Sequence, residues 1–159
     1  MANFSATNLQ AGTQQNLSSS FKTLLEIHAV TSGRRGFIYE FDIGIDGTPN
    51  ATDCSIDWDA NRTSAAGTGT SITPNPLDPA DIAAASLVVN GNHTAEPTAV
   101  STGNLWSLGA NQRASYRWIA RDDKSALWIP ATSLSGIGIR AKSATYASTA
   151  VATAHYVEQ

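Results

Sequence analysis

The chain has 159 residues, of which 42% are apolar and only 14% are charged, and its formal net charge is -3. A chain of this length suits one domain with its own core. The charge argues against a nucleic-acid binder, because phosphate binding depends on clustered Lys and Arg. The single cysteine, Cys54, excludes an internal disulfide and a multi-cysteine zinc site. No apolar run approaches the ~20 residues of a membrane span, so we expect no direct nucleic-acid or membrane partner.

The first twenty residues are mostly polar, and after Met1 their larger apolar positions are Phe4, Leu9 and Leu17. They lack the basic start and apolar centre of a signal peptide. Terminal polar segments fray unless something holds them. We therefore expect residues 1–20 to be an extended arm that lies along its own sheet or along a neighbouring subunit. Of the two we predict packing on a neighbour, with Phe4, Leu9 and Leu17 as possible contacts. Residues 21–159 are expected to form a single β-sandwich domain.

The next segments alternate apolar and polar side chains, which is the two-residue period of strands. Residues 21–31 and 37–46 flank the turn Ser32–Gly36 and are expected to pair as an antiparallel hairpin. A third strand is expected at 53–62, with Cys54, Ile56 and Trp58 on its apolar side. In the second strand, one core-facing side is expected to hold Phe37, Tyr39, Phe41, Ile43 and Ile45.

The middle of the chain is a long connection, residues 66–79, with a short strand near 70–73. Asp78 as N-cap and Pro79 at the first position favour a short helix through the following alanines to about Ser86. Residues 94–112 read as a loop or a short strand. Asn90–Asn92 and Asp122–Lys124 are expected turns, and further strands are expected at 87–89, 113–121, 126–129, 137–142 and 145–157.

About seven to nine strands, with turn signals every ~8–12 residues, predict an all-β fold. The long connections favour an antiparallel β-sandwich of jelly-roll or Greek-key type over a simple meander. The expected fold therefore has one short helix in a crossing loop and an extended N-terminal arm.

The three histidines, His28, His93 and His155, lie far apart in the sequence and have no metal-binding spacing. We expect His28 and His155 to be strand-face residues. Gly67 and Gly69 lie in a Gly-rich stretch that lacks the Lys and the helix of a P-loop, and no nucleophile elbow is present. The sequence thus predicts no enzyme, with no catalytic, cofactor-binding or metal-binding residues.

An acidic row, Asp53, Asp57 and Asp59, follows the polar side of the third strand. Such a row can bind Ca²⁺ or supply the carboxylate pair of a glycosidase. It can equally be a charged strand face that discourages edge-to-edge aggregation.

The basic residues Arg113, Arg117 and Arg121 have even spacing, which would place them together on one strand face. That face would be either solvated or in contact with an acidic partner surface.

The four tryptophans raise the alternative of a sugar-stacking platform. Trp58 and Trp118 follow the inward rhythm of their strands and are expected in the core. Trp106, flanked by Asn104 and Ser107, is the candidate for an exposed aromatic that contacts a ligand or another subunit.

Several segments together resemble a known type of protein. They are the Ser/Thr/Asn/Gln-rich start before FKTLLEIHA, the pair YEFDIGIDGTP and CSIDWDANR, the crossing AGTGTSITPNPLDPAD, the strand NQRASYRWIA and the Gly-Ile-Gly-Ile stretch. In texture and element order the chain resembles small jelly-roll virion proteins of tailed bacteriophages, which decorate or cement the head or join its appendages. No residue-specific motif is shared.

The resemblance implies a non-enzymatic structural protein, a homotrimer on a symmetric shell. Its partners would be copies of itself and the major capsid or other virion proteins. It would be located in the virion, after assembly in the cytoplasm of the bacterial host.

Two other interpretations remain open at this stage. One is a carbohydrate-binding or receptor-binding module, such as a phage tail or appendage protein, that uses exposed aromatics and the acidic row. The other is a small hydrolase that uses Asp57, Asp59 and a histidine.

Overall fold

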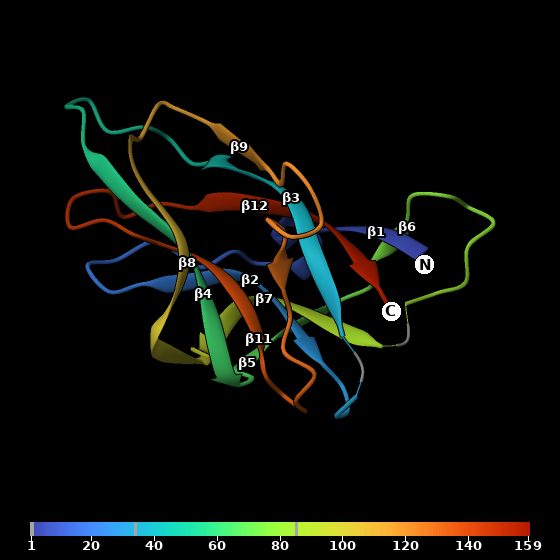
Figure 1. Ribbon diagram of the computed structural model, residues 1–159. Helices are drawn as coiled ribbons and strands as arrows, with labels where there is room; N and C mark the ends of the chain where they lie inside the picture. Colours follow the sequence, from blue (N-terminus) through green and yellow to red (C-terminus); the bar gives the residue numbers. More distant parts are fainter. Residues whose placement is uncertain (1, 34, 85) are drawn as a thin grey trace.

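Two antiparallel six-stranded sheets stack face to face (Figure 1). The computed structural model describes residues 2–33, 35–84 and 86–159. Sheet 1 has the strand order β10-β3-β12-β1-β6, with β9 also beside β3. Its strands are β1 (Ala2–Thr7), β3 (Gly36–Ile45), β6 (Asn75–Pro76), β9 (Tyr116–Ile119), β10 (Leu127–Trp128) and β12 (Ala150–Glu158).

Sheet 2 has the strand order β5-β7-β2-β11-β4-β8. A short 3₁₀ helix, η1 (Asn8–Ala11), connects β1 towards sheet 2. The strands of sheet 2 are β2 (Lys22–Ala29), β4 (Ser55–Ala65), β5 (Thr68–Ile72), β7 (Leu87–Ala95), β8 (Thr98–Asn111) and β11 (Gly136–Lys142). The predicted all-β antiparallel sandwich is confirmed.

Strands that follow one another in the chain are not neighbours in either sheet, as far as the described residues go. The expected hairpin of residues 21–31 and 37–46 is wrong, because β2 lies in sheet 2 and β3 lies in sheet 1. The apolar sides of the two strands point into the common core from opposite sheets. Alternation predicts which side of a strand is apolar but carries no information about its neighbours.

The N-terminal segment is part of the sandwich, not an arm that leaves it. β1 pairs with β12 along its whole length, from Ala2 with Glu158 to Thr7 with Thr153. Phe4 is buried and its ring stacks on Tyr156 with centroids 5.5 Å apart. Residues 2–20 therefore pack on their own chain, and Met1 lies outside the described residues. The strand is too short, with only two inward positions, for its period to stand out in the sequence.

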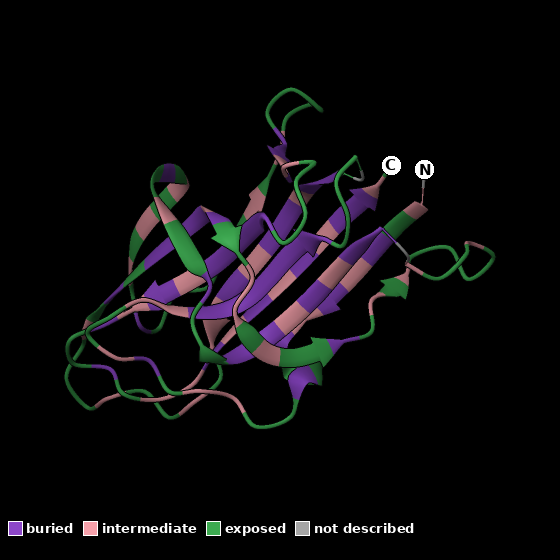
Figure 2. Cartoon of the chain, turned by 90° about the horizontal axis from the view of Figure 1, so that it is seen from below, coloured by how far each residue is buried: buried purple, intermediate pink, exposed green. Residues whose placement is uncertain are grey.

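The core lies between the two sheets, and buried positions concentrate on the central strands while the loops are exposed (Figure 2). Along β12, Ala150, Ala152, Ala154 and Tyr156 face inward, as the alternation predicts. Trp58 is also buried in this core, as expected.

A β-bulge in β3 reverses which side chains face the core: the odd-numbered residues before the bulge point outward and those after it point inward. His155 of β12 pairs with Glu40, but the next residue pairs with Ile38, so Tyr39 is the extra residue. Phe41 and Ile43 face the core as expected, whereas Phe37 and Tyr39 face outward. The prediction of one common face is wrong for these two residues. Phe37 instead forms a second small cluster on the outer side of sheet 1, with Ala126, Val157 and Trp128.

The expected helix from Asp78 to Ser86 is wrong over its described residues. Only one turn forms, in which the Asp81 N–H donates to the Asp78 carbonyl and the Ala80 N–H to the Asp78 side chain. Most of this segment is exposed to solvent, with the Ile82 side chain at 79%, and only Ala84 packs against the core among its described apolar side chains. An isolated short helix is unstable without packing. The loop projects from the sandwich beside the chain termini (Figure 1).

Two other segments differ from expectation. Residues 94–112, expected to be a loop or a short strand, contain the 14-residue strand β8. The pairing of β8 with β4 shifts register at several points, so its side chains do not keep one regular alternation. The expected turn Asn90–Asn92 lies inside β7, where Asn92 has a φ of 50° and bends the strand.

Candidate functional site

A bent two-stranded ribbon closes over one end of sheet 2. Only Ala66 and Gly67 separate β4 from β5, and only two residues separate β7 from β8. Ala65 pairs with Thr98, and Thr68 pairs with Ala95. The two long strands thus run together from the β4–β8 side of the sheet to the β5–β7 side. We call residues 63–69 and 93–99 the crossing ribbon.

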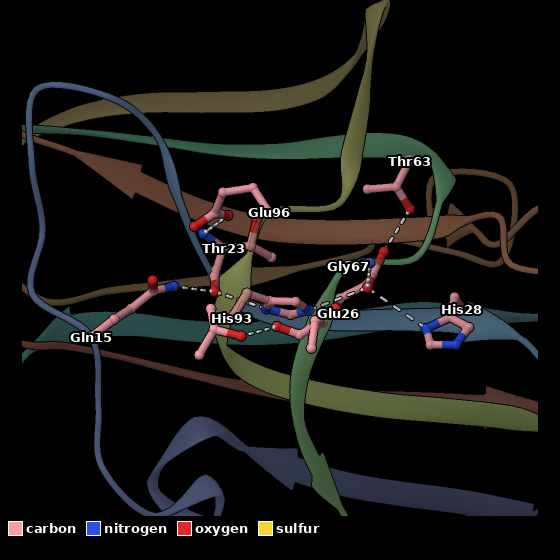
Figure 3. A network of polar contacts seen from close by, with 10 residues as sticks. Gln15, Thr23, Glu26, His28, Thr63, Gly67, His93 and Glu96 are labelled. Atoms are coloured by element: carbon pink, nitrogen blue, oxygen red, sulfur yellow. Dashed lines mark hydrogen bonds and ion pairs between the residues drawn. The ribbon is translucent and has the colours of Figure 1, made fainter.

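Glu26 of β2 attaches the crossing ribbon to the middle of sheet 2. Its carboxylate is fully buried. One oxygen accepts a hydrogen bond from the Thr63 hydroxyl at 2.9 Å, and the other accepts from the Gly67 N–H at 3.3 Å. The same second oxygen lies 3.3 Å from Nε2 of His93 (Figure 3). One buried carboxylate therefore holds three donors from three parts of the ribbon.

Glycines make room for these contacts. Gly138 of β11 pairs with Glu26 on one side and Asn61 on the other, so no side chain stands between Glu26 and β4. Gly69 approaches the His93 ring so closely that an added Cβ would lie 3.0 Å from Nε2. The Gly67–Gly69 stretch thus presents an N–H to a carboxylate of the same chain, and it is not a phosphate-binding loop.

His93 contacts an acceptor with each of its ring nitrogens. Nδ1 lies 3.2 Å from the Thr23 carbonyl and Nε2 faces the Glu26 carboxylate. A carbonyl can only accept, so Nδ1 carries a proton. The contact with Glu26 needs a second proton, either on Nε2 or on the carboxyl group. Glu26 and His93 therefore form a pair that is neutral as a whole, which is how a buried carboxylate is tolerated.

His28 is the third titratable group of the cluster. Its Nδ1 lies 3.7 Å from the same Glu26 oxygen, beyond hydrogen-bond distance, and finds no hydrogen-bond partner within the described part of the chain. Burial lowers the pKa of His28 below its usual value; the charge of Glu26 opposes this shift and His93 adds to it. His28 is thus neutral at neutral pH.

A second carboxylate–histidine contact lies on the outer side of sheet 1. Glu40 accepts an ion pair from Arg117, and His155 Nδ1 lies 3.5 Å from its other oxygen. Burial, assisted by Glu40, raises the pKa of the neighbouring Tyr39. His28 and His155 both lie on strand faces, as expected.

The acidic row does not form a joint site. Asp53 pairs with Arg113 at 2.8 Å and Asp57 with Lys142 at 3.7 Å. A hydrogen bond from Arg113 lowers the pKa of the exposed Asp53 carboxyl. The predicted arginine face is not continuous either, since of the three arginines only Arg117 lies in β9.

Asp59 is buried and forms a two-pronged pair with Arg140, Nε to Oδ1 at 2.8 Å and Nη2 to Oδ2 at 2.5 Å. Neither Asp57 nor Asp59 has a histidine among its ion-pair partners. Within the described residues, no group of three or more His, Cys, Asp or Glu side chains is placed to hold a metal ion.

The four expected contact residues have different environments. Phe4 and Leu17 are buried in the core of their own chain, while Leu9 is exposed on η1. Trp106 is half-buried, stacking on Tyr116 with centroids 5.7 Å apart and meeting Phe41 edge-on at 5.0 Å. Trp106 is therefore part of an aromatic packing, and the more exposed ring of that packing is Tyr116.

The sequence gives little signal for the Glu26 cluster. Glu26 and His28 share one face of a strand in FKTLLEIHA, but His93 joins them only through the bend of β7 and the ribbon. Comparisons with protein-family models, curated proteins and solved structures found no match. In the part of the chain described, no helix has the length and apolar character needed to cross a bilayer.

Proposed function

We propose that the chain is a non-enzymatic viral structural protein, a phage capsid decoration or cement protein that self-associates and stabilises the virion shell. It would act as a homotrimer, bind the major capsid or other virion proteins, and reside in the virion after assembly in the bacterial cytoplasm. The overall resemblance described for the sequence supports this assignment, and the sandwich is compatible with it.

The observation that carries the proposal is the projecting loop Leu77–Ala84. It holds two exposed large apolar side chains, Leu77 at 50% and Ile82 at 79% exposure. Leu77 lies at the edge of sheet 1, where its N–H donates to the Asn3 carbonyl, and the loop that follows it projects beside the chain termini (Figure 1). Large apolar side chains left exposed on a surface mark a contact with another molecule. The strongest titratable cluster supports the same view, because Glu26 and His93 are buried and satisfied by each other, with no access for a substrate.

The test is to replace both apolar side chains, Leu77→Ser with Ile82→Ser, and to measure mass by analytical ultracentrifugation. Burial of one Ile contributes about 1.5–3 kcal/mol, so its loss alone weakens each contact roughly ten- to hundredfold. We expect the double variant to dissociate into single chains. Each single chain should still be folded and should melt at the same temperature as a dissociated wild-type chain. Leu134→Asn is the matched control, since Leu134 is an exposed apolar residue of another loop. Equal masses for the wild-type chain and the double variant would contradict the proposal.

A receptor-binding or carbohydrate-binding module is the second candidate, favoured by the Tyr116 ring, which is 43% exposed beside Trp106. Aromatic faces of this kind stack on sugars. Binding on a glycan array that is lost in Tyr116→Ala would support this candidate. Absence of binding by the wild-type chain would remove it.

A further inference from the structure

The attachment of the crossing ribbon to β2 depends on titratable groups. Glu26 receives Thr63, Gly67 and His93 from the ribbon. In the opposite direction, Glu96 of the ribbon accepts from the Thr23 N–H of β2 at 2.8 Å. The ribbon is therefore held by two carboxylates, one buried and one partly exposed, and its attachment changes if the charge around Glu26 changes.

The surroundings of Glu26 accommodate the one proton held by the Glu26–His93 pair, but they do not accommodate a further proton on His28. The Glu26–His93 pair already holds the single proton that makes it neutral, since both ring nitrogens of His93 face acceptors. A second proton on His28 would add a positive charge next to this pair. It would have only the Glu26 oxygen at 3.7 Å as a counter-charge, and that oxygen is already in contact with His93 and Gly67.

No other charged group of the described neighbourhood compensates this charge. By strand register, β11 places Gly136 next to His28 and β7 places Val88 there. Gly136 also pairs with Thr63 of β4, which is uncharged. Among the other charged groups along sheet 2, Arg62 of β4 is also cationic and donates to the Trp128 carbonyl, while Lys22 pairs with Glu96 and Arg140 pairs with Asp59.

We propose that the crossing ribbon is an acid-operated latch: when His28 takes up a proton from solvent, the uncompensated positive charge beside Glu26 and His93 detaches the ribbon from β2. The detached state exposes His28 to water, where the imidazolium is stabilised. The Thr63 and Gly67 donors lose their common acceptor contact at the same time. The rest of the sandwich stays folded, because its core lies on the other side of sheet 2.

The direction of the pH effect follows from the burial of His28. In the closed state its pKa is lowered, and in the detached state it returns towards the ordinary value of 6.5. The detached state then binds more protons than the closed state at any pH between these two values. The closed state therefore loses stability as the pH falls below about 6.5, by at most tenfold in the opening equilibrium per pH unit for one proton.

The test is amide hydrogen exchange between about pH 8 and about pH 5, corrected for the intrinsic rate. In the wild-type chain we expect the Gly67 N–H and the rest of the crossing ribbon to lose protection below about pH 6.5, by up to tenfold per unit. The β2–β11 ladder should remain more strongly protected than the ribbon at every pH, because it opens only when the whole domain unfolds. His28→Gln should abolish the loss of ribbon protection below about pH 6.5. His155→Gln, which removes a histidine of sheet 1, should leave the wild-type behaviour unchanged.

Four results would overturn the latch. The first is ribbon protection in the wild-type chain that does not vary with pH, a result that needs no variant to fold. The second is equal protection of the ribbon and of β2–β11 at every pH, which would mean that the ribbon opens only when the whole domain unfolds. The third is an acid response that persists in His28→Gln. A His28 imidazole titration by NMR with a midpoint at or above 6.5 in the closed chain would also overturn it.

Discussion

The pair Asp59–Arg140 offers the sharpest test of whether the acidic row is structural. Asp59 is 3% exposed and Arg140 12%, and the two are joined by two hydrogen bonds at 2.8 and 2.5 Å. Asp59→Asn keeps the shape of the side chain but leaves the buried guanidinium without a counter-charge. Breaking such a pair costs about 3–5 kcal/mol. For a domain of this size, the melting temperature should fall by roughly 6–20 °C.

The assay is thermal and urea unfolding of a double-mutant cycle with Asp59→Asn, Arg140→Met and both together. The double variant should be more stable than the sum of the single effects by about 1 kcal/mol or more, because it leaves no unpaired charge. Asp57→Asn is the matched control: Asp57 is 57% exposed and lies 3.7 Å from Lys142, so its loss should stay within about 0.5 kcal/mol. If Asp59→Asn is as mild as Asp57→Asn, the reasoning is refuted.

Three further outcomes follow from side-chain contacts and from the burial of His28. Trp106→Ala should lower the free energy of unfolding by on the order of 3 kcal/mol, because the indole packs between two aromatic rings; an unchanged urea midpoint would speak against this. Gly138→Val should cost about 1–3 kcal/mol and weaken ribbon protection, because an added Cβ would lie 3.2 Å from Cγ2 of Thr23 and 3.7 Å from Cγ2 of Thr63, which holds the ribbon to Glu26; wild-type stability would argue otherwise. Overall stability should fall as the pH drops below about 6.5, because burial lowers the pKa of His28; a flat urea midpoint from pH 8 to about pH 5 would disprove it.

Side-chain alternation was a good guide to the fold class and to many faces. Trp58 on β4 and the inward alanines of β12 lie in the core because each strand keeps a regular period of two over its length. The antiparallel sandwich follows from many such short strands. These features depend only on residues close together in the sequence.

Features that depend on residues far apart could not be predicted. Tyr39 sits in a bulge that is visible only in its pairing with β12, and the sequence shows an unbroken alternation there. Phe4 is an isolated apolar residue in the sequence, and its core position depends on the pairing of β1 with β12 at the other end of the chain. The helix start at Asp78 has suitable capping residues, but the segment that follows it is mostly exposed, with Ile82 at 79%, so little packing stabilises a helix there.

The Glu26 cluster was hidden for the same reason. Its three partners in the ribbon are far from Glu26 in the sequence: Thr63 is 37 residues away, Gly67 is 41 and His93 is 67. No short motif encodes this convergence. The one local trace is the pair of glycines in β11: a side chain at Gly136 would collide with His28, and one at Gly138 would crowd Thr23 and Thr63.

The native mass of the full-length wild-type chain, measured from dilute to concentrated solution, tests the structural role most directly. A self-associating virion subunit should give the mass of several copies, with three as the expected number, and should dissociate when Leu77 and Ile82 are replaced. A chain that remains a single copy at every concentration, with both side chains still facing water, would contradict the proposed function.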